Sequence, residues 1–271
     1  MAGMRITVCL PALDVARVEA AVAEAMAPFE IDYTRDEDRD IWDSWRITGR
    51  LPVLPDQERD PRLIQESSRI YDTRHGWVEW PRMAPDEFGW CAGGPRELLD
   101  LWTAQKYQDQ ARQVAEGAWQ RWRELAAELP TVQPRQFYQD RHDADPGTYS
   151  SEQADADYAA QPLVHAYENY LRTSPSPRAW SMYTYDPVVA VGSVDRDEFV
   201  AFVVERARPR HNVLSLDGWW YEDGWTGIHG ACRSTADCPH EPEIAPGYDH
   251  LADYLAALPG DTMLVELRCH V

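Results

Sequence analysis

The two ends of the chain constrain the fold most, because both have the pattern of buried β-strands. Met4–Pro11 is rich in β-branched residues and ends at a proline, and Thr262–Val271 follows a Pro-Gly-Asp turn. Helical periodicity follows the first strand at Leu13–Ala27 and precedes the last one at Tyr248–Leu258. We therefore expect both terminal strands to lie in the same sheet.

The elements near the C-terminus repeat this strand and helix order. Asp195–Arg206 has the pattern of a capped helix, and Asp217-Gly218 is a hairpin signal before an aromatic run. We predict one α+β domain over 1–271, with an antiparallel or mixed sheet and helices on one face. A ferredoxin-like arrangement is one architecture of this class.

Two segments interrupt this pattern. Residues 28–95 are rich in Pro, Asp and aromatic side chains, which predicts an irregular, loop-rich segment of the kind that often carries function. Residues 96–175 contain helical periodicity over Arg96–Leu129 and again over Asp157–Arg172, which predicts a helical insertion with a surface excursion between them. Trp180–Val194 alternates and then becomes apolar, as a strand would.

Charge and composition restrict the partners and the location. The chain has 46 acidic and 26 basic residues, a net charge of −20, so we expect no direct binding to nucleic acid and none to anionic membranes. The N-terminus lacks the basic-then-apolar order of a signal peptide, and no apolar run approaches the roughly 20 residues of a membrane span. Five cysteines, an odd number, favour a reducing compartment. We expect a cytoplasmic protein.

One loop carries two pairs of soft donors, His229 with Cys232 and Cys238 with His240. Two imidazoles and two thiolates can complete a tetrahedral zinc site, so these four residues are candidate ligands of a structural zinc ion. The alternatives are a mobile polar loop with free thiols and a disulfide between Cys232 and Cys238. No other cofactor is expected.

An aromatic segment beside arginine is a candidate site for a planar or anionic ligand, because a guanidinium offers a fork of donors and an indole a stacking face. Its candidate residues are Trp42, Asp43, Trp45, Arg46 and Arg50. A second aromatic run frames either a pocket or a hairpin that covers the core, and comprises Trp219, Trp220 and Tyr221. The alternative for the first segment is a tryptophan core with Asp43 paired to an arginine.

Catalytic signatures are sparse. The sequence contains no Walker loop, no GxGxxG, no nucleophile elbow and no HExxH. An enzyme would have to combine Asp43, Arg50 and His270 where the loop-rich segment meets the sheet. Cys269 and His270 are adjacent in a strand and face opposite sides, so they do not form a nucleophile and base pair themselves.

Three segments together resemble a family of uncharacterised accessory proteins of actinobacterial phages and prophages. They are Ala25–Glu30 after the first helix, the run WDSWRITGR at Trp42–Arg50, and the tail LPGDTMLVELRCHV with its Asp-Thr and Cys-His pairs. The chain differs from the family pattern at Thr48, Leu51 and Arg268. The resemblance implies a phage or prophage accessory protein that acts inside the host cell, and it supplies no activity.

These observations favour an accessory protein that binds a small ligand or a host protein without catalysis. One alternative is a hydrolase or transferase of unknown substrate with an Asp/Arg/His site. Another is an acidic inhibitor that mimics DNA, with carboxylates spaced like phosphates along one face. Whether the protein is an enzyme stays open at this stage.

Overall fold

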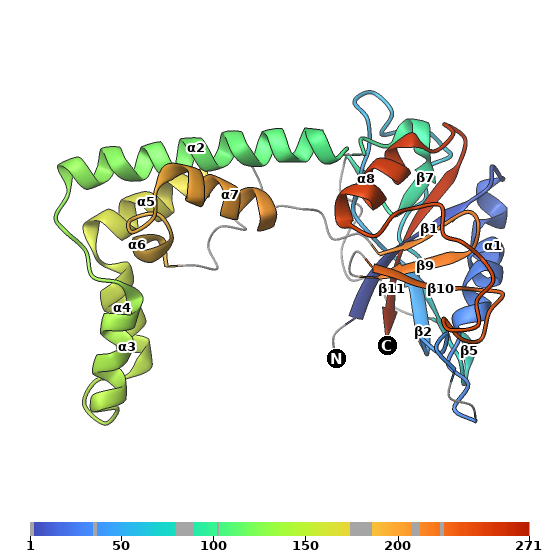
Figure 1. Ribbon diagram of the computed structural model, residues 1–271, viewed down its shortest axis with the longest axis horizontal. Coiled ribbons are helices and arrows are strands. Elements are labelled where there is room, and N and C mark those ends of the chain that lie inside the picture. The colour runs from blue at the N-terminus through green and yellow to red at the C-terminus, as the bar shows by residue number, and fades with distance from the viewer. Residues whose placement is uncertain are drawn as a thin grey trace. The chain divides into compact units, whose positions relative to one another are not determined.

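The chain forms two compact units (Figure 1). Met1–Ala104 and Pro209–Val271 make up the sheet unit, and Gln105–Arg208 makes up the helical unit. The computed structural model describes residues 3–34, 37–79, 89–101, 103–173, 186–206, 212–222 and 225–270. The division into two units differs from the single domain predicted for 1–271. Among the described helices, none combines the length and the apolar character of a membrane span.

The terminal strands β1 (Gly3–Leu10) and β11 (Met263–His270) are antiparallel neighbours, paired without a break from Gly3–His270 to Leu10–Met263. This confirms that both lie in one sheet. On its other side β1 pairs in parallel with β8, so the sheet is mixed and the α+β class is confirmed.

The described strands of the main sheet follow one order, with β7 (Gly93–Pro95) paired to β11 beside β2. That order is β10 (Trp225–His229), β9 (Trp219–Glu222), β8 (Val213–Leu214), β1, β11, β2 (Ser44–Ile47), β4 (Arg69–Asp72) and β5 (Gly76–Glu79). The short strands β3 (Leu51–Pro52) and β6 (Trp90–Cys91) pair with each other. Strands β8 and β9 form the hairpin expected around Asp217-Gly218.

Helices cover both faces of the sheet, which differs from the predicted arrangement with helices on one face and from a ferredoxin-like layout (Figure 1). Val8 of β1 packs with α1 (Val18–Met26) on one face, whereas Cys9 packs with α8 (Tyr248–Ala257) on the other. The physical reason is that the middle of β1 and the start of β11 are apolar on both faces, and each apolar face needs a cover.

The segment 28–95 is more regular than predicted. Its described residues begin with a 3-10 turn at Ala27–Phe29 and contribute β2, β4, β5 and β7 to the main sheet. These strands are short, and β2 and β7 pair with the distant β11, whereas β4 and β5 form a local hairpin, so local periodicity does not reveal the sheet. Glycine is needed in β7, because a Cβ at Gly93 would lie 2.4 Å from the Leu264 carbonyl oxygen.

The helical unit extends beyond the predicted insertion 96–175. A 3-10 turn at Arg96–Leu98 belongs to the sheet unit. The described helices from Ala104 to Arg206 are α2 (Ala104–Glu128), α3 (Arg135–Ala144), α4 (Ser151–Ala159), α5 (Pro162–Thr173), α6 (Pro187–Ala190) and α7 (Arg196–Arg206). Phe199 and Val203 of α7 share one apolar core with Trp122 of α2 and Leu171 of α5, so α7 completes this unit.

Two local predictions change in this region. The expected surface excursion after Arg96–Leu129 contains α3 and the start of α4. The expected strand Trp180–Val194 falls partly outside the described residues, and its described part begins the helix α6, where Asp186 accepts a hydrogen bond from the Val188 amide at 3.0 Å. An aspartate cap followed by Pro187 starts a helix, whereas the apolar residues after it have the pattern of a strand.

Replacing Leu264 with Ala tests how far stability depends on the β1–β11 pair. Leu264 is fully buried in β11, so we expect Leu264→Ala to lower the free energy of unfolding by about 2–5 kcal/mol in urea titrations followed by fluorescence. The matched control is Leu216→Ala, because Leu216 is 43% exposed, and it should change stability by less than about 1 kcal/mol. Equal losses in the two variants would contradict this account.

Candidate metal centre

Three donor side chains converge where β10 ends. The chain turns directly after His229, and the Cys232 amide donates to the His229 carbonyl oxygen at 2.8 Å. Ligand atoms of His229, Cys232 and His240 all lie within 4.8 Å of one another. No other group of this kind was found in the part of the chain that the structure describes.

Cys238, the fourth predicted residue, contacts Cys232 and His240 but does not belong to the group whose ligand atoms all lie within 4.8 Å of one another. Its Sγ lies 3.2 Å from Cys232 Sγ and 3.7 Å from His240 Nδ1, and Cys232 Sγ lies 3.2 Å from the same Nδ1. Both cysteines are free, so no disulfide links them. In a tetrahedral zinc site with Zn–S of about 2.3 Å and Zn–N of about 2.0–2.1 Å, neighbouring ligand atoms are about 3.4–3.8 Å apart. The separation between Cys238 and His240 falls within this range, and the two 3.2 Å contacts of Cys232 are shorter than it, so these three side chains would have to move apart slightly to hold the ion.

Hydrogen bonds fix the tautomer of His229. Its Nε2 lies 2.8 Å from the carbonyl oxygen of Asp217, which can only accept, so Nε2 carries the proton. The Ala231 amide donates to Nδ1 at 3.2 Å, so a metal ion bound at Nδ1 would replace this hydrogen bond. A backbone carbonyl that holds the second ring nitrogen is a common support of metal-binding histidines. The His229 and His240 rings stack with centroids 3.8 Å apart.

Polar contacts attach the loop to the segment 37–39. The amide and hydroxyl of Thr235 donate to the Asp38 carboxylate at 2.8 and 2.9 Å, and these hydrogen bonds lower the pKa of Asp38. Arg233 lies 3.8 Å from the Glu37 carboxylate. Cys232 is 8% exposed and joins the core beneath α1, so the donor group sits between this core and an exposed polar loop.

A cavity of about 580 Å³ adjoins the donor group within the sheet unit. Ala21 and Ala25 of α1 line one wall, and His229 with the two residues after it lines another. The loop packs closely here, since a Cβ at Gly230 would lie 3.2 Å from Phe29. His229 therefore belongs both to the donor group and to the cavity wall. The further lining residues are Cys9, Leu10, Pro11, Ala12, Leu13, Arg17, Glu24, Pro28, Leu214, Ser215, Leu216 and Gly218.

The aromatic residues predicted to bind a ligand lie in the core of the sheet unit. Each of them is at most 5% exposed: Trp42, Trp45, Trp219, Trp220 and Tyr221. Trp45 stacks on Tyr71 with ring centroids 5.7 Å apart, and Trp42 Nε1 donates to the Met26 carbonyl oxygen at 3.0 Å. These contacts are those of packed core side chains.

The residues proposed for catalysis are only partly brought together. Asp43 Oδ1 lies 2.8 Å from His270 Nδ1, although the two are 227 positions apart in sequence. The Arg50 amide donates to the Glu266 carboxylate at 3.3 Å. Glu266 and His270 are four residues apart in β11, so the backbone contacted by Arg50 lies about 13 Å from that of His270. Arg46 instead lies 3.3 Å from Glu66.

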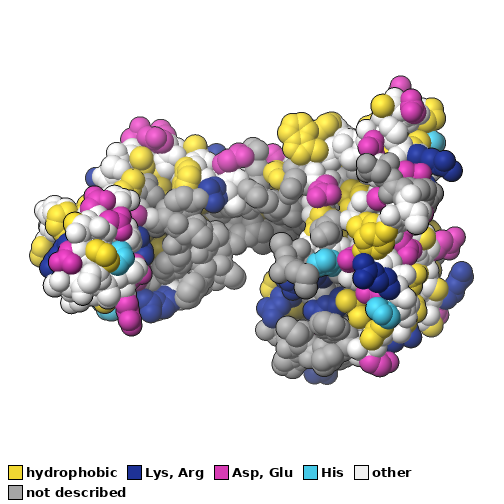
Figure 2. Space-filling model, turned by 90° about the horizontal axis from the view of Figure 1, so that it is seen from below, with side chains coloured by type: hydrophobic (Ala, Val, Ile, Leu, Met, Phe, Trp, Pro, Cys, Tyr) yellow, Lys and Arg dark blue, Asp and Glu magenta, His cyan; other side chains and the backbone are white. Residues whose placement is uncertain are grey.

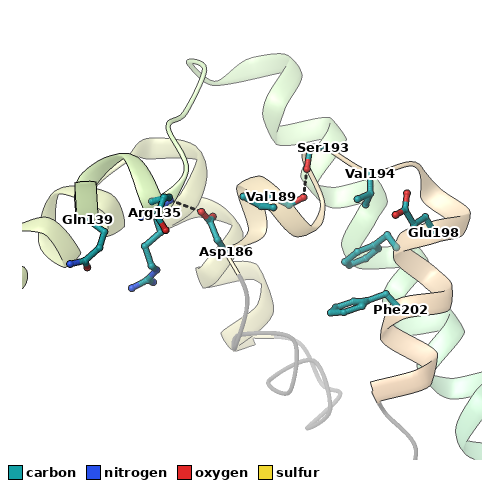
Figure 3. A pocket seen from close by; sticks show the side chains of 10 residues that line it. Arg135, Gln139, Asp186, Val189, Ser193, Val194, Glu198 and Phe202 are labelled. Atoms are coloured by element: carbon teal, nitrogen blue, oxygen red, sulfur yellow. Dashed lines mark hydrogen bonds between the residues drawn. The ribbon is translucent and has the colours of Figure 1, made fainter. Parts of the chain in front are cut away.

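A second cavity, of about 550 Å³, lies within the helical unit and was not anticipated from sequence (Figure 3). Val189, Val194 and Phe202 supply apolar lining, and Arg135 and Glu198 supply charge. Phe199 is buried in the helical core, whereas Phe202 of the same helix is 39% exposed. An exposed phenylalanine on a helix is the signal that spacing alone does not give.

Comparisons with protein-family models, with curated proteins and with solved structures found no match to this chain. We therefore infer function from its own residues.

Thiol labelling tests this picture of the cysteines. Burial raises the pKa of Cys91 to about 11 and that of Cys269 to about 12, and raises that of Cys9 as well, so few of these thiols ionise at pH 8. Cys238 is only half-buried. With iodoacetamide at pH 8 and metal-free protein, we expect mass spectrometry to find Cys238 modified first. Protein in urea, in which all five should react, is the control, and equally fast labelling of Cys269 in the native state would contradict the structure.

Proposed function

We propose that this protein is a non-catalytic binding protein in which a structural zinc ion, held by His229, Cys232, Cys238 and His240, orders one wall of a small-ligand cavity. The convergence of the donor atoms within 4.8 Å for three of these residues, with Cys238 in contact, carries the proposal. His229 connects the ion to the cavity, because it takes part in both.

The donor set suits zinc. Thiolate and imidazole ligands in a tetrahedral arrangement select zinc over the oxygen-seeking cations magnesium and calcium. Four protein ligands leave no open position for a reacting water, which is the property of a structural site. The loop has no regular secondary structure between β10 and α8, so the metal replaces the backbone pairing that it lacks.

The cavity suits a small, mainly apolar ligand. Its volume of about 580 Å³ is within the usual range of about 300–1,000 Å³ for small-molecule sites. Alanine, leucine, proline and phenylalanine side chains dominate its lining, and Arg17 and Glu24 provide charged groups for orientation. We propose the host cytoplasm of a phage or prophage as the setting, on the strength of the sequence resemblance alone.

Zinc content tests the metal. Protein purified under reducing conditions should bind one zinc ion per chain, measured by elemental mass spectrometry, and Cys232→Ser and His240→Ala should lose it. Removal of zinc by a chelator should lower Tm by more than about 5 °C, since zinc at 1,000 times its Kd contributes about 4 kcal/mol.

The matched control is His165→Ala, which removes an exposed histidine of α5 in the helical unit and should leave zinc binding unchanged. Full zinc content in His240→Ala, or no zinc in the wild type after the metal-free protein is reconstituted with zinc, would contradict the metal proposal.

Filling the cavity tests the ligand site. Ala25 lines the cavity, so Ala25→Trp should reduce the fluorescence of the bound apolar dye anilinonaphthalene sulfonate at least about fivefold, because the indole occupies its space. Ala20 is exposed on the same helix, so Ala20→Trp is the control and should bind dye like the wild type. Circular dichroism checks that both variants fold, and equal dye binding in both would count against this cavity.

A further inference from the structure

Three arginines lie side by side on neighbouring strands of the main sheet. The register places Arg5 of β1 opposite Arg268 of β11, and Arg268 opposite Arg46 of β2. Residues that are directly opposite in antiparallel strands share a face, with Cβ atoms about 4.5–5.5 Å apart. Arg5, Arg268 and Arg46 therefore form a continuous arginine row across three strands.

Such a row is electrostatically unfavourable by itself, because like charges directly opposite each other destabilise a sheet. It is also unexpected in a chain with a net charge of −20. In the view from below, basic side chains gather in a hollow of the sheet unit (Figure 2). Since the chain's one lysine, Lys106, belongs to the helical unit, the basic side chains of the sheet unit are arginines.

The two outer arginines, Arg5 and Arg46, form ion pairs with glutamates, whereas the central Arg268 forms none among the described residues. Arg5 lies 3.5 Å from Glu266, and Arg46 lies 3.3 Å from Glu66. Within the described residues, the Arg268 side chain has no ion pair or hydrogen bond, and it is exposed. Among the described residues, two of the three guanidinium groups of the row are thus paired with a carboxylate. Burial raises the pKa of Glu266, which favours its neutral form and reduces the compensation further.

Arg46 is the buried member of the row. The residue is 8% exposed, and its inaccessible Nη1 lies 3.3 Å from the Glu66 carboxylate, without the geometry of a hydrogen bond. Buried polar groups in native proteins are nearly always hydrogen-bonded, so the donor geometry of Arg46 is only partly used by Glu66.

On the face of the sheet that α8 covers, the side chains of β11 change from apolar to polar at the arginine row. Cys9 and Leu264 belong to the apolar core beneath α8, whereas Glu266, Arg268 and His270 continue the same face of β11 with polar groups. No described residue of that core lies beyond Leu264 on this strand. The end of the sheet therefore presents a polar surface in place of a packed one.

We propose that Arg5, Arg46 and Arg268 bind a small-molecule oxyanion of the phosphate class, such as a phosphate ester. Arginine forks match phosphate oxygens in pairs, and a bound dianion relieves the repulsion along the row. A polynucleotide does not fit, because the chain as a whole repels a phosphate backbone. The site goes beyond the proposed zinc and cavity function, since Arg5 and Leu10 are about 17 Å apart along β1.

The test is calorimetric titration of the intact protein with inorganic phosphate and with pyrophosphate at constant ionic strength. We expect both anions to bind, and Arg268→Gln to weaken binding at least tenfold. Arg268→Lys keeps the charge and loses the fork, so it should have an intermediate affinity. Arg172→Gln is the matched control, because it removes the same charge from an exposed position of α5 and should bind like the wild type.

Thermal unfolding separates a binding role from a structural one. Without phosphate, Arg268→Gln should melt at or above the wild-type Tm, because it removes repulsion from the row. With phosphate, the wild type should gain Tm and the variant should not. Absence of binding to both anions in the folded wild type, wild-type affinity in Arg268→Gln, or an equal loss in Arg172→Gln would each overturn the proposal. None of these outcomes depends on zinc.

Discussion

The pairing of β1 with β11 is the interaction on which the rest of the sheet unit depends. It joins residues 3–10 to residues 263–270, so nearly the whole chain lies in the loop that it closes. Closing a loop of this length costs entropy that grows only slowly with length, but the contacts that repay it form late. Every other strand of the main sheet adds to one side or the other of this pair, directly or through a neighbour.

The side-chain pattern of this pair also explains where chemistry gathers. Where the later part of β1 pairs with the start of β11, both faces are apolar, so α1 covers one and α8 covers the other. Polar groups are then confined to the margins. The donor group of His229 and Cys232 follows the edge strand β10, and the arginine row lies where the apolar pattern of β11 gives way to Glu266, Arg268 and His270.

The candidate metal residues could be selected from sequence because the four donors lie within twelve positions of one another, and a short loop keeps them close in any fold. The distances between their donor atoms could not be predicted from sequence, and these distances distinguish a converging group from separate free thiols. The aromatic candidates show the opposite case. A tryptophan in a strand looks the same in sequence whether it lines a pocket or fills the core, and only the burial of Trp42 and Trp45 places them in the core.

Local pattern by itself determined the terminal strands, the helices beside them, the β8–β9 hairpin and the α+β class, because each depends on periodicity or turn chemistry within a few residues. The tertiary structure alone decided three other features: the second covered face of the sheet, the end of the helical unit at α7, and the alignment of Arg5, Arg268 and Arg46. Each of these depends on register or packing between segments that are distant in sequence, and a change of one residue in register would turn every side chain of a strand to the other face.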